Sequence, residues 1–384
     1  MSVPRRIVIV GAGQSGLQVA LSLRERGYAG ALALVGEEAE PPYHRPPLSK
    51  KAIISPMRAE QLEIRAPKAL ADARIDLHLG RRAVTLDPKA RAVTLDDGAR
   101  LACDALVLAI GVKPRRLPLE RRNLFTLRQL GEAAAIQARL ADARRIAIVG
   151  GGYIGLEAAA ALRASGREVT VVEMADRLLA RVTAPPMSDY FARLHRGHGV
   201  ALHFGARIAR FEGDGELTAL HLADGTRIGV DLVIAGIGNV MDTALAAQLG
   251  LDAADGIAVD EFCRAGIPHL YAVGDCTRFP SRRHGREVRL ESVQHAVDHA
   301  KACAAAIMGA GEAYDPVPWF WSDQYDVKLQ IAGLSQGHDR AEVAGDMAAH
   351  KFSVSYRAGG RLLAVDSVND ARAHMLARRE IAAG

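Results

Sequence analysis

The chain has 384 residues, of which 49% are apolar, 24% are charged and 5% are aromatic. This length and composition favour an α/β protein of two or three domains over an all-β protein. The net charge of +5 comes without any run that interleaves basic and aromatic residues, and no apolar run approaches the roughly 18 residues that cross a bilayer. Nucleic-acid-binding and membrane-spanning classes are therefore excluded.

The four cysteines do not form a CxxC pair or a cluster with metal-ligand spacing; they are Cys103, Cys263, Cys276 and Cys303. We expect free and mostly buried thiols, as in a reducing compartment, and no metal site. The N-terminal apolar run reaches glycine too soon for a secretory signal, so we expect a cytoplasmic protein.

Residues 6–20, RIVIVGAGQSGLQVA, form the first recognisable motif. An apolar strand leads into G-x-G-x-x-G, and small residues open the helix that follows. The first glycine permits a tight turn, the second lets a pyrophosphate approach the backbone, and the third brings helix and strand together. The motif glycines are Gly11, Gly13 and Gly16, and the predicted elements after them are helix 14–27 and strand 31–35. Glu37 follows this strand, where an acid binds a ribose hydroxyl group.

The same motif returns at residues 145–159, RIAIVGGGYIGLEAA. Each helix would direct free N–H groups and the positive end of its dipole toward phosphates. The predicted elements are glycines Gly150, Gly152 and Gly155, helix 153–165, strand 168–172 and the ribose acid Glu173.

Two dinucleotide sites in one chain point to two dinucleotides that exchange a hydride, and the natural pair is a flavin and a nicotinamide. Glu173 would accept a hydrogen bond from a free 2′-hydroxyl group and would repel a 2′-phosphate. The sequence therefore favours NADH over NADPH, with Arg177 as the residue that could reverse this preference.

Residues 41–51, PPYHRPPLSKK, form a stiff, basic segment without a thiol. Its prolines fix the backbone. Without a nearby cysteine, electrons cannot pass from a flavin to a disulfide and must leave to an outside acceptor. A solvated proline-rich loop with surface charges is the alternative interpretation.

The remaining chain carries further strand and helix patterns. AVTL occurs twice around DPKAR, which predicts a hairpin with a proline-containing turn. A second meander is expected at 216–238, a buried strand ending at Gly274-Asp275, and a helix at 290–309. From residue 316 the pattern changes to alternating strands and a final helix, which predicts a smaller α+β domain.

Several motifs in this order resemble the FAD-dependent ferredoxin reductases of bacterial oxygenase systems, a glutathione-reductase-like flavoprotein family. They are the paired glycine motifs, YHRPPLSK, LAIGVKPRRLP, YAVGDC, RLESVQHA and WFWSDQYD. The resemblance covers essentially the whole chain. It implies an α/β fold with two Rossmann-like dinucleotide-binding domains and a C-terminal α+β domain. The implied boundaries are 1–113 and 236–315 for FAD, 114–235 for NAD, and 316–384 for the C-terminal domain.

The resemblance also implies the reaction. NADH would reduce FAD, and single electrons would pass to a [2Fe–2S] ferredoxin that serves an oxygenase of the P450 or Rieske type. The partners are thus NADH and ferredoxin, and we expect a monomer or weak dimer. The other classes weighed are a redox-signalling flavoprotein of the apoptosis-inducing-factor type and an NADH-dependent disulfide or peroxide reductase. The lack of cysteine at 40–60 argues against the reductase alternative.

Roles for single residues follow from the same resemblance. Arg45 would neutralise the FAD pyrophosphate and Lys50 would lie beside the isoalloxazine. Glu157 would pair with Lys50 and face the nicotinamide carboxamide, although an ordinary acid in the first turns of a helix is also possible. Asp275 would bind the ribityl chain, and the Val293 N–H would face the flavin pyrimidine edge at a helix N-terminus.

The last two candidates concern the outer side of the flavin. Trp319 and Trp321 lie in the segment that the family places against the flavin, with a core role as the alternative. The basic run 278–289, RFPSRRHGREVR, is a candidate surface for an acidic ferredoxin, and a solvated charged loop is an equally acceptable interpretation.

Overall fold

The structure is a computed structural model that describes residues 3–87 and 89–384. Backbone contacts divide it into two units. Unit 1 comprises Met1–His44, Arg58–Lys113 and Val240–Pro318, and unit 2 comprises Arg45–Met57, Pro114–Asn239 and Trp319–Gly384. Among the described residues, no helix combines the length and apolarity that a membrane span requires.

Unit 1 is built on a parallel five-stranded sheet with the order β19-β7-β1-β2-β3. Its strands are β1 (Arg6–Val10), β2 (Ala31–Gly36), β3 (Asp76–Leu79), β7 (Ala105–Leu108) and β19 (Leu270–Ala272). β1 lies at the centre, bonded to β2 and β7, and its residues after Arg6 are all buried. Such a continuous apolar run is typical of a strand covered on both faces.

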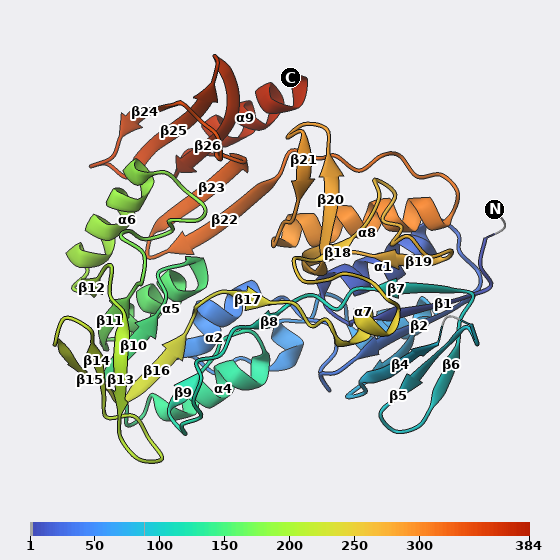
Figure 1. Ribbon diagram of the computed structural model, residues 1–384, viewed down its shortest axis with the longest axis horizontal. Coiled ribbons are helices and arrows are strands. Elements are labelled where there is room, and N and C mark those ends of the chain that lie inside the picture. Colours follow the sequence, from blue (N-terminus) through green and yellow to red (C-terminus); the bar gives the residue numbers. More distant parts are fainter. Residues whose placement is uncertain (1–2, 88) are drawn as a thin grey trace. The chain divides into compact units, whose positions relative to one another are not determined.

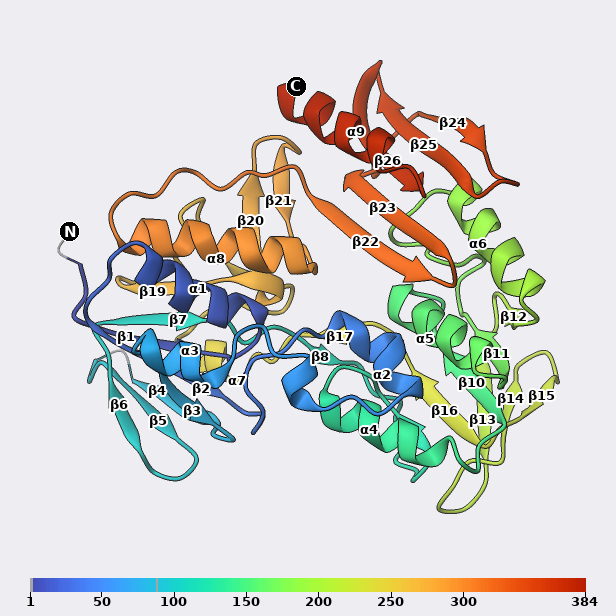
Figure 2. The ribbon, with the colours of Figure 1, turned by 180° about the vertical axis from the view of Figure 1, so that it is seen from behind.

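Helices α1 (Gln14–Glu25) and α8 (Val293–Ile307) lie side by side against this sheet (Figures 1 and 2). Their small and apolar residues form one core with the strands, including Leu17, Leu23, Ala300 and Cys303. Alanines on α8 allow the two helices to pack closely. The predicted helix at 290–309 is thus confirmed, with its first turn starting at Val293.

The other elements of unit 1 are smaller. Strands β4 (Ala83–Asp87), β5 (Ala92–Leu95) and β6 (Arg100–Ala102) form the predicted antiparallel meander, whose turn residue Pro88 lies outside the described residues. The rest are α3 (Pro67–Asp72), α7 (Ala244–Gln248), β18 (Ile257–Ala258), β20 (Thr277–Ser281), β21 (Arg286–Val288) and the 3-10 turns Ala59–Gln61 and Gly274–Cys276.

Unit 2 repeats the parallel design with the order β12-β11-β10-β16-β9. Its strands are β9 (Leu124–Phe125), β10 (Arg145–Val149), β11 (Glu168–Val172), β12 (Ala201–His203) and β16 (Leu232–Ala235). A meander of β13 (Ile208–Glu212), β14 (Ala219–Leu222) and β15 (Arg227–Gly229) again precedes the return strand. The helices are α2 (Lys51–Ile54), α4 (Leu130–Arg139), α5 (Tyr153–Ala164) and α6 (Pro185–Gly197), and Pro46–Ser49 forms a 3-10 turn.

The C-terminal part of unit 2 is an antiparallel sheet with the order β22-β23-β26-β25-β24, packed against α9 (Ala371–Ala383) (Figure 1). The strands are β22 (Trp319–Gln324), β23 (Val327–Gly333), β24 (Arg340–Asp346), β25 (Lys351–Ala358) and β26 (Arg361–Val368). The predicted α/β class with a C-terminal α+β part is confirmed. Short strands β8 (Lys113–Pro114) and β17 (Asn239–Val240) lie where the chain passes from one unit to the other.

Candidate functional site

The first glycine loop joins β1 to α1 in unit 1. Gly11 has φ +112°, and a Cβ there would lie 2.2 Å from the Ala109 carbonyl oxygen, so only glycine fits. A Cβ on Gly16 would meet the Gly11 oxygen at 1.9 Å, whereas one on Gly13 would meet nothing within 4 Å. Gly13 is also the N-cap of α1 and makes no side-chain cap. The loop thus offers an open backbone surface and helix N–H groups, which fits a dinucleotide pyrophosphate.

Three other predicted FAD residues also belong to unit 1. Glu37 is exposed and directly follows β2, and Asp275 is half-buried in the turn Gly274–Cys276. Val293 begins α8, where the Ser292 hydroxyl accepts the His295 N–H at 3.0 Å. The Ser292 cap thus occupies the backbone N–H of His295 and not the backbone N–H of Val293.

The second glycine loop joins β10 to α5 in unit 2. Gly150 has φ +109°, and a Cβ there would lie 2.3 Å from the Gly236 oxygen. Gly152 is the N-cap of α5, again without a side-chain cap and with open space where a Cβ would be. A Cβ on Gly155 would meet the Gly150 oxygen at 2.4 Å. The loop fits a second dinucleotide for the same reasons as the first.

Glu173 follows β11 and folds back onto this loop. Its carboxylate accepts the Gly151 N–H at 2.5 Å and the Ala175 N–H at 2.7 Å. The sequence did not predict the Gly151 contact, because the middle residue of a glycine motif has no assigned role. Met174, the next residue, is 76% exposed.

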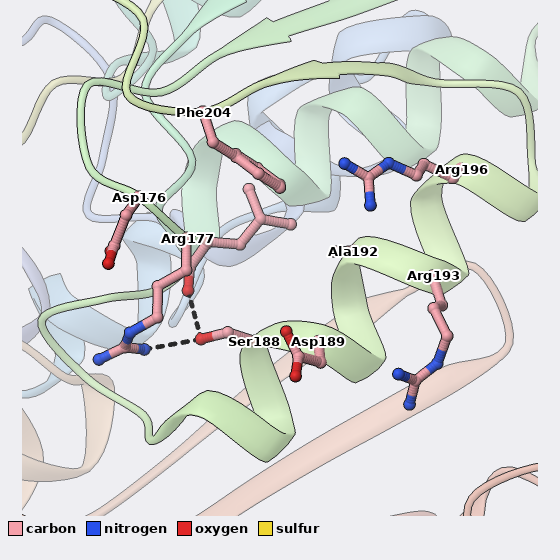
Figure 3. Close-up of a pocket in the computed structure, with 9 residues that line it drawn as sticks. Asp176, Arg177, Ser188, Asp189, Ala192, Arg193, Arg196 and Phe204 are labelled. Carbon is pink, nitrogen blue, oxygen red and sulfur yellow. Dashed lines mark hydrogen bonds between the residues drawn. The ribbon is translucent and has the colours of Figure 1, made fainter.

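Arg177 is committed to structural bonds in the loop after Glu173. Its guanidinium donates to the carbonyl oxygens of Thr183 and Ala180, each at 2.9 Å. It also donates to the Ser188 hydroxyl at 2.7 Å (Figure 3). Arg177 and Ser188 border a cavity of about 290 Å³ beside α6. Its lining also includes Asp176, Asp189, Arg193, Arg196 and Phe204, with the Arg196 guanidinium 5.2 Å from the Phe204 ring centre.

A buried polar cluster surrounds Glu157 on the second turn of α5. Glu157 is 7% exposed, and its carboxylate accepts the Ser49 hydroxyl at 2.5 Å and the Ser322 hydroxyl at 2.7 Å. Lys50 Nζ lies 3.5 Å from Glu157 and 3.1 Å from Asp323. The structure thus brings Lys50 and Glu157 together and adds three residues that the sequence did not predict: Ser49, Ser322 and Asp323.

Burial and neighbouring charges shift the pKa values of Glu157 and Asp323, the two acids of this cluster, in opposite directions. Burial raises the pKa of Glu157 despite the opposing effects of Lys50 and the two hydroxyl groups. The pKa of Asp323 is also pushed up by burial, but its bonds to Lys328 and Lys50 outweigh that effect and lower it. Lys50 is therefore held by a buried acid with a raised pKa and by a more exposed, ionised one.

Local sequence explains how Lys50 reaches this position. Pro46 and Pro47 start the 3-10 turn Pro46–Ser49, since proline fixes φ and needs no N–H partner at the start of a helix. Lys50 then separates this turn from α2, with φ −121° and ψ −110°. Arg45 precedes the turn, and its guanidinium donates to the Arg128 carbonyl oxygen at 2.8 Å.

The two tryptophans lie on β22. Their ring centres are 5.8 Å apart, and both residues are partly exposed. Trp319 also contacts His374 and lies 5.1 Å from the Arg378 guanidinium, both on α9. Trp319 therefore ties β22 to α9.

Much of the basic run 278–289 is already paired with acids inside unit 1. Arg278 lies 3.1 Å from Glu287, Arg282 lies 3.5 Å from Glu261, and Arg289 bonds Glu291. Arg282 and Arg286 are exposed.

All four cysteines are free and buried, as the sequence predicts. Burial raises the pKa of Cys276 to about 12 and raises that of Cys103. Low thiolate content makes these thiols poor redox nucleophiles.

The chain matches two family models. Residues 5–300 match the pyridine nucleotide-disulphide oxidoreductase model, and residues 319–384 match the reductase C-terminal model. The chain belongs to the pyridine nucleotide-disulphide oxidoreductase family. Within this family it belongs with the ferredoxin reductases, and it is an FAD-containing oxidoreductase that uses NAD(P)H.

Three relatives support this placement. The chain is 42% identical to putidaredoxin reductase CamA of Pseudomonas putida, over 96% of this chain and 90% of that protein. It is 40% identical to a solved ferredoxin reductase for the CYP199A2 system of Rhodopseudomonas palustris, with TM-score 0.95 over 97% and 93% of the chains. A structure of the covalent putidaredoxin reductase–putidaredoxin complex is 41% identical to the chain, with a TM-score of 0.94. The match covers 98% of this chain and 93% of that chain.

Proposed function

We propose that this chain is an NADH-dependent reductase of a [2Fe–2S] ferredoxin that serves an oxygenase of the P450 or Rieske type. The observation that carries this proposal is the presence of two open glycine loops in one chain whose four thiols are all buried. The putidaredoxin reductase–putidaredoxin complex, at 41% identity, supports a small electron-carrier protein as the acceptor. The free thiols agree with a reducing compartment such as the cytoplasm.

The FAD site is assigned to unit 1 and the nicotinamide site to unit 2. Within the proposed boundaries, 1–113 and 236–315 form the FAD domain, 114–235 the NAD domain and 316–384 the C-terminal domain. The FAD ligands in unit 1 would be Gly11, Gly13, Gly16, Glu37, Asp275 and the Val293 N–H. The roles expected of Arg45, Lys50 and Trp321 toward FAD stay predictions. When bound, FAD accepts a hydride from NADH and passes its electrons on one at a time.

Coenzyme preference follows from Glu173 and Arg177. Two backbone N–H groups hold the Glu173 carboxylate in one place, where it can accept a ribose hydroxyl and oppose a 2′-phosphate. The three bonds of the Arg177 guanidinium keep it from neutralising such a phosphate. We therefore assign NADH as the preferred coenzyme.

Lys50 and Glu157 would position the nicotinamide and would not transfer a proton, because hydride transfer needs orientation and not a general base. Ser49 and Ser322 keep Glu157 hydrogen-bonded in its buried place, and Asp323 keeps Lys50 extended toward it.

The direct test is electron transfer from NADH through the purified yellow protein to cytochrome c, with and without added ferredoxins from oxygenase systems. We expect the full rate to require a ferredoxin. Equal or faster reduction of a small disulfide or a peroxide would contradict the proposal and favour the disulfide-reductase class.

A further inference from the structure

Asp366 is a buried acid in the middle of the C-terminal sheet. It lies on β26, opposite Ile331 of β23 and Val354 of β25, and is 1% exposed. One carboxylate oxygen accepts the Tyr356 hydroxyl at 2.7 Å. The other, Oδ1, is buried without a partner among the described residues. A buried carboxylate oxygen without a hydrogen-bond partner lowers the stability of the fold, so its presence calls for a functional explanation.

Tyr153 supplies the complementary group. It is the first residue of α5, directly after the N-cap Gly152, and its ring packs 4.6 Å from that of Phe320 on β22. Its hydroxyl group is likewise buried and has no partner within the described chain. Burial, and then the nearby charge of Asp366, raise the pKa of Tyr153, so the two groups lie within electrostatic reach. One is a donor and the other an acceptor.

We propose that Asp366 is a positioning residue for the nicotinamide coenzyme: its carboxylate is linked to the Tyr153 hydroxyl group through one buried water, and this link fixes the start of α5. The N–H groups of this first turn are those assigned to the pyrophosphate. Glu157 lies four residues further on the same face of α5 and is held by Ser322 of the same sheet. The C-terminal sheet thus holds the helix at two successive turns.

This contact is sensitive to protonation. Burial raises the pKa of Asp366 to about 7, and the Tyr356 hydrogen bond partly opposes this. The titratable groups around it are Tyr356 from β25, with His338 against the Tyr356 ring, and Tyr153 from α5, which also lies near Glu157. A charged carboxylate accepts a hydroxyl more strongly than a neutral acid does. Coenzyme affinity should therefore fall as the pH drops through neutrality.

The inference rests on the proposed coenzyme site, and its test measures binding of NAD⁺ to the FAD-loaded protein by calorimetry. For the wild type we expect a Kd about 5-fold higher near pH 6 than near pH 8.5. Asp366→Asn and Tyr153→Phe should each bind NAD⁺ weakly at all pH values, with a flat profile. Their double variant should be no weaker than either alone.

Two further variants separate positioning from a loss of sheet stability. Tyr356→Phe removes the bond that lowers the pKa of Asp366, so it should move the inflection of the profile to higher pH. Because Tyr356 bonds Asp366 and not Glu157, this shift assigns the inflection to Asp366. Ser367→Ala, the control, removes a 3.0 Å bond to Gln330 on the opposite face of β26 and should leave the profile unchanged.

Wild-type affinity and an unchanged profile in folded Asp366→Asn and Tyr153→Phe would overturn the inference while leaving the coenzyme site in place. Failure of the wild type to bind NAD⁺ at any pH would instead remove the coenzyme site, and this inference with it.

Discussion

Replacement of Lys50 by methionine tests the buried cluster around Glu157. The change keeps an unbranched side chain that is one atom shorter but removes the cation 3.5 Å from the Glu157 carboxylate. Removing one partner of a buried pair costs about 3–5 kcal/mol, because it leaves an uncompensated charge. The Ser49 and Ser322 hydroxyl groups remain bonded to Glu157, so we expect the low end, about 3 kcal/mol at neutral pH.

The pH dependence of this cost has a definite sign. In the folded protein burial raises the pKa of Glu157 above its ordinary value of 4.5, and loss of Lys50 removes a cause that lowers it. A group with a raised folded pKa has its full stability below the unfolded pKa and loses stability as the pH rises through the folded pKa. The stability of the Lys50→Met protein should thus be close to that of the wild type at acidic pH. It should fall increasingly below the wild-type stability as the pH rises through the folded pKa of Glu157.

Thermal unfolding followed by circular dichroism from about pH 5 to pH 8 measures this difference. At ~2.1 cal/mol/K per residue, the unfolding entropy of a chain of 384 residues is about 0.8 kcal/mol/K, so for about 3 kcal/mol we expect the Tm near neutral pH to fall by roughly 4 °C. Lys328→Met is the matched control, since Lys328 also pairs with Asp323, at 2.7 Å, but is half exposed and should cost about 0–1 kcal/mol. Equal, pH-independent losses in both variants would refute the assignment of a buried, charge-sensitive Glu157.

Three other predictions concern coenzyme choice, electron exit and docking. Glu173→Arg should shift the NADH/NADPH preference toward NADPH by about 10- to 100-fold in kcat/KM, because it replaces repulsion of a phosphate by attraction; Asp176→Asn is the control, and an unchanged ratio would remove the ribose role of Glu173. Iodoacetamide treatment of the native protein should leave NADH-dependent ferredoxin reduction intact, because the thiols are buried; loss of rate in step with thiol modification would place a thiol on the electron path. Joint replacement of Arg282 and Arg286 by glutamate should raise the KM for ferredoxin and weaken its salt dependence, with kcat retained. If Arg340→Glu on β24 has the same effect, the basic run has no special role in docking.

The sequence alone determined the two nucleotide-binding units. Glycine motifs act locally: each sets a turn and a helix start within a few residues, so Gly11 and Gly150 and the elements after them were predictable from their spacing. Strand 168–172 was predicted with the bounds that β11 has in the structure. The free, buried state of the cysteines followed equally from their spacing and composition.

Only the tertiary structure decided which distant residues contact the side chains of the site. Ser49 and Ser322 are 273 positions apart, yet both bond Glu157. The charge of Asp366, on the last strand along the chain, likewise raises the pKa of Tyr153 at the start of α5. No local pattern marks such residues, because their roles depend on burial and on partners far away in the chain. Arg177 shows the same limit, since only its three bonds reveal that its guanidinium is already held by neighbouring neutral groups.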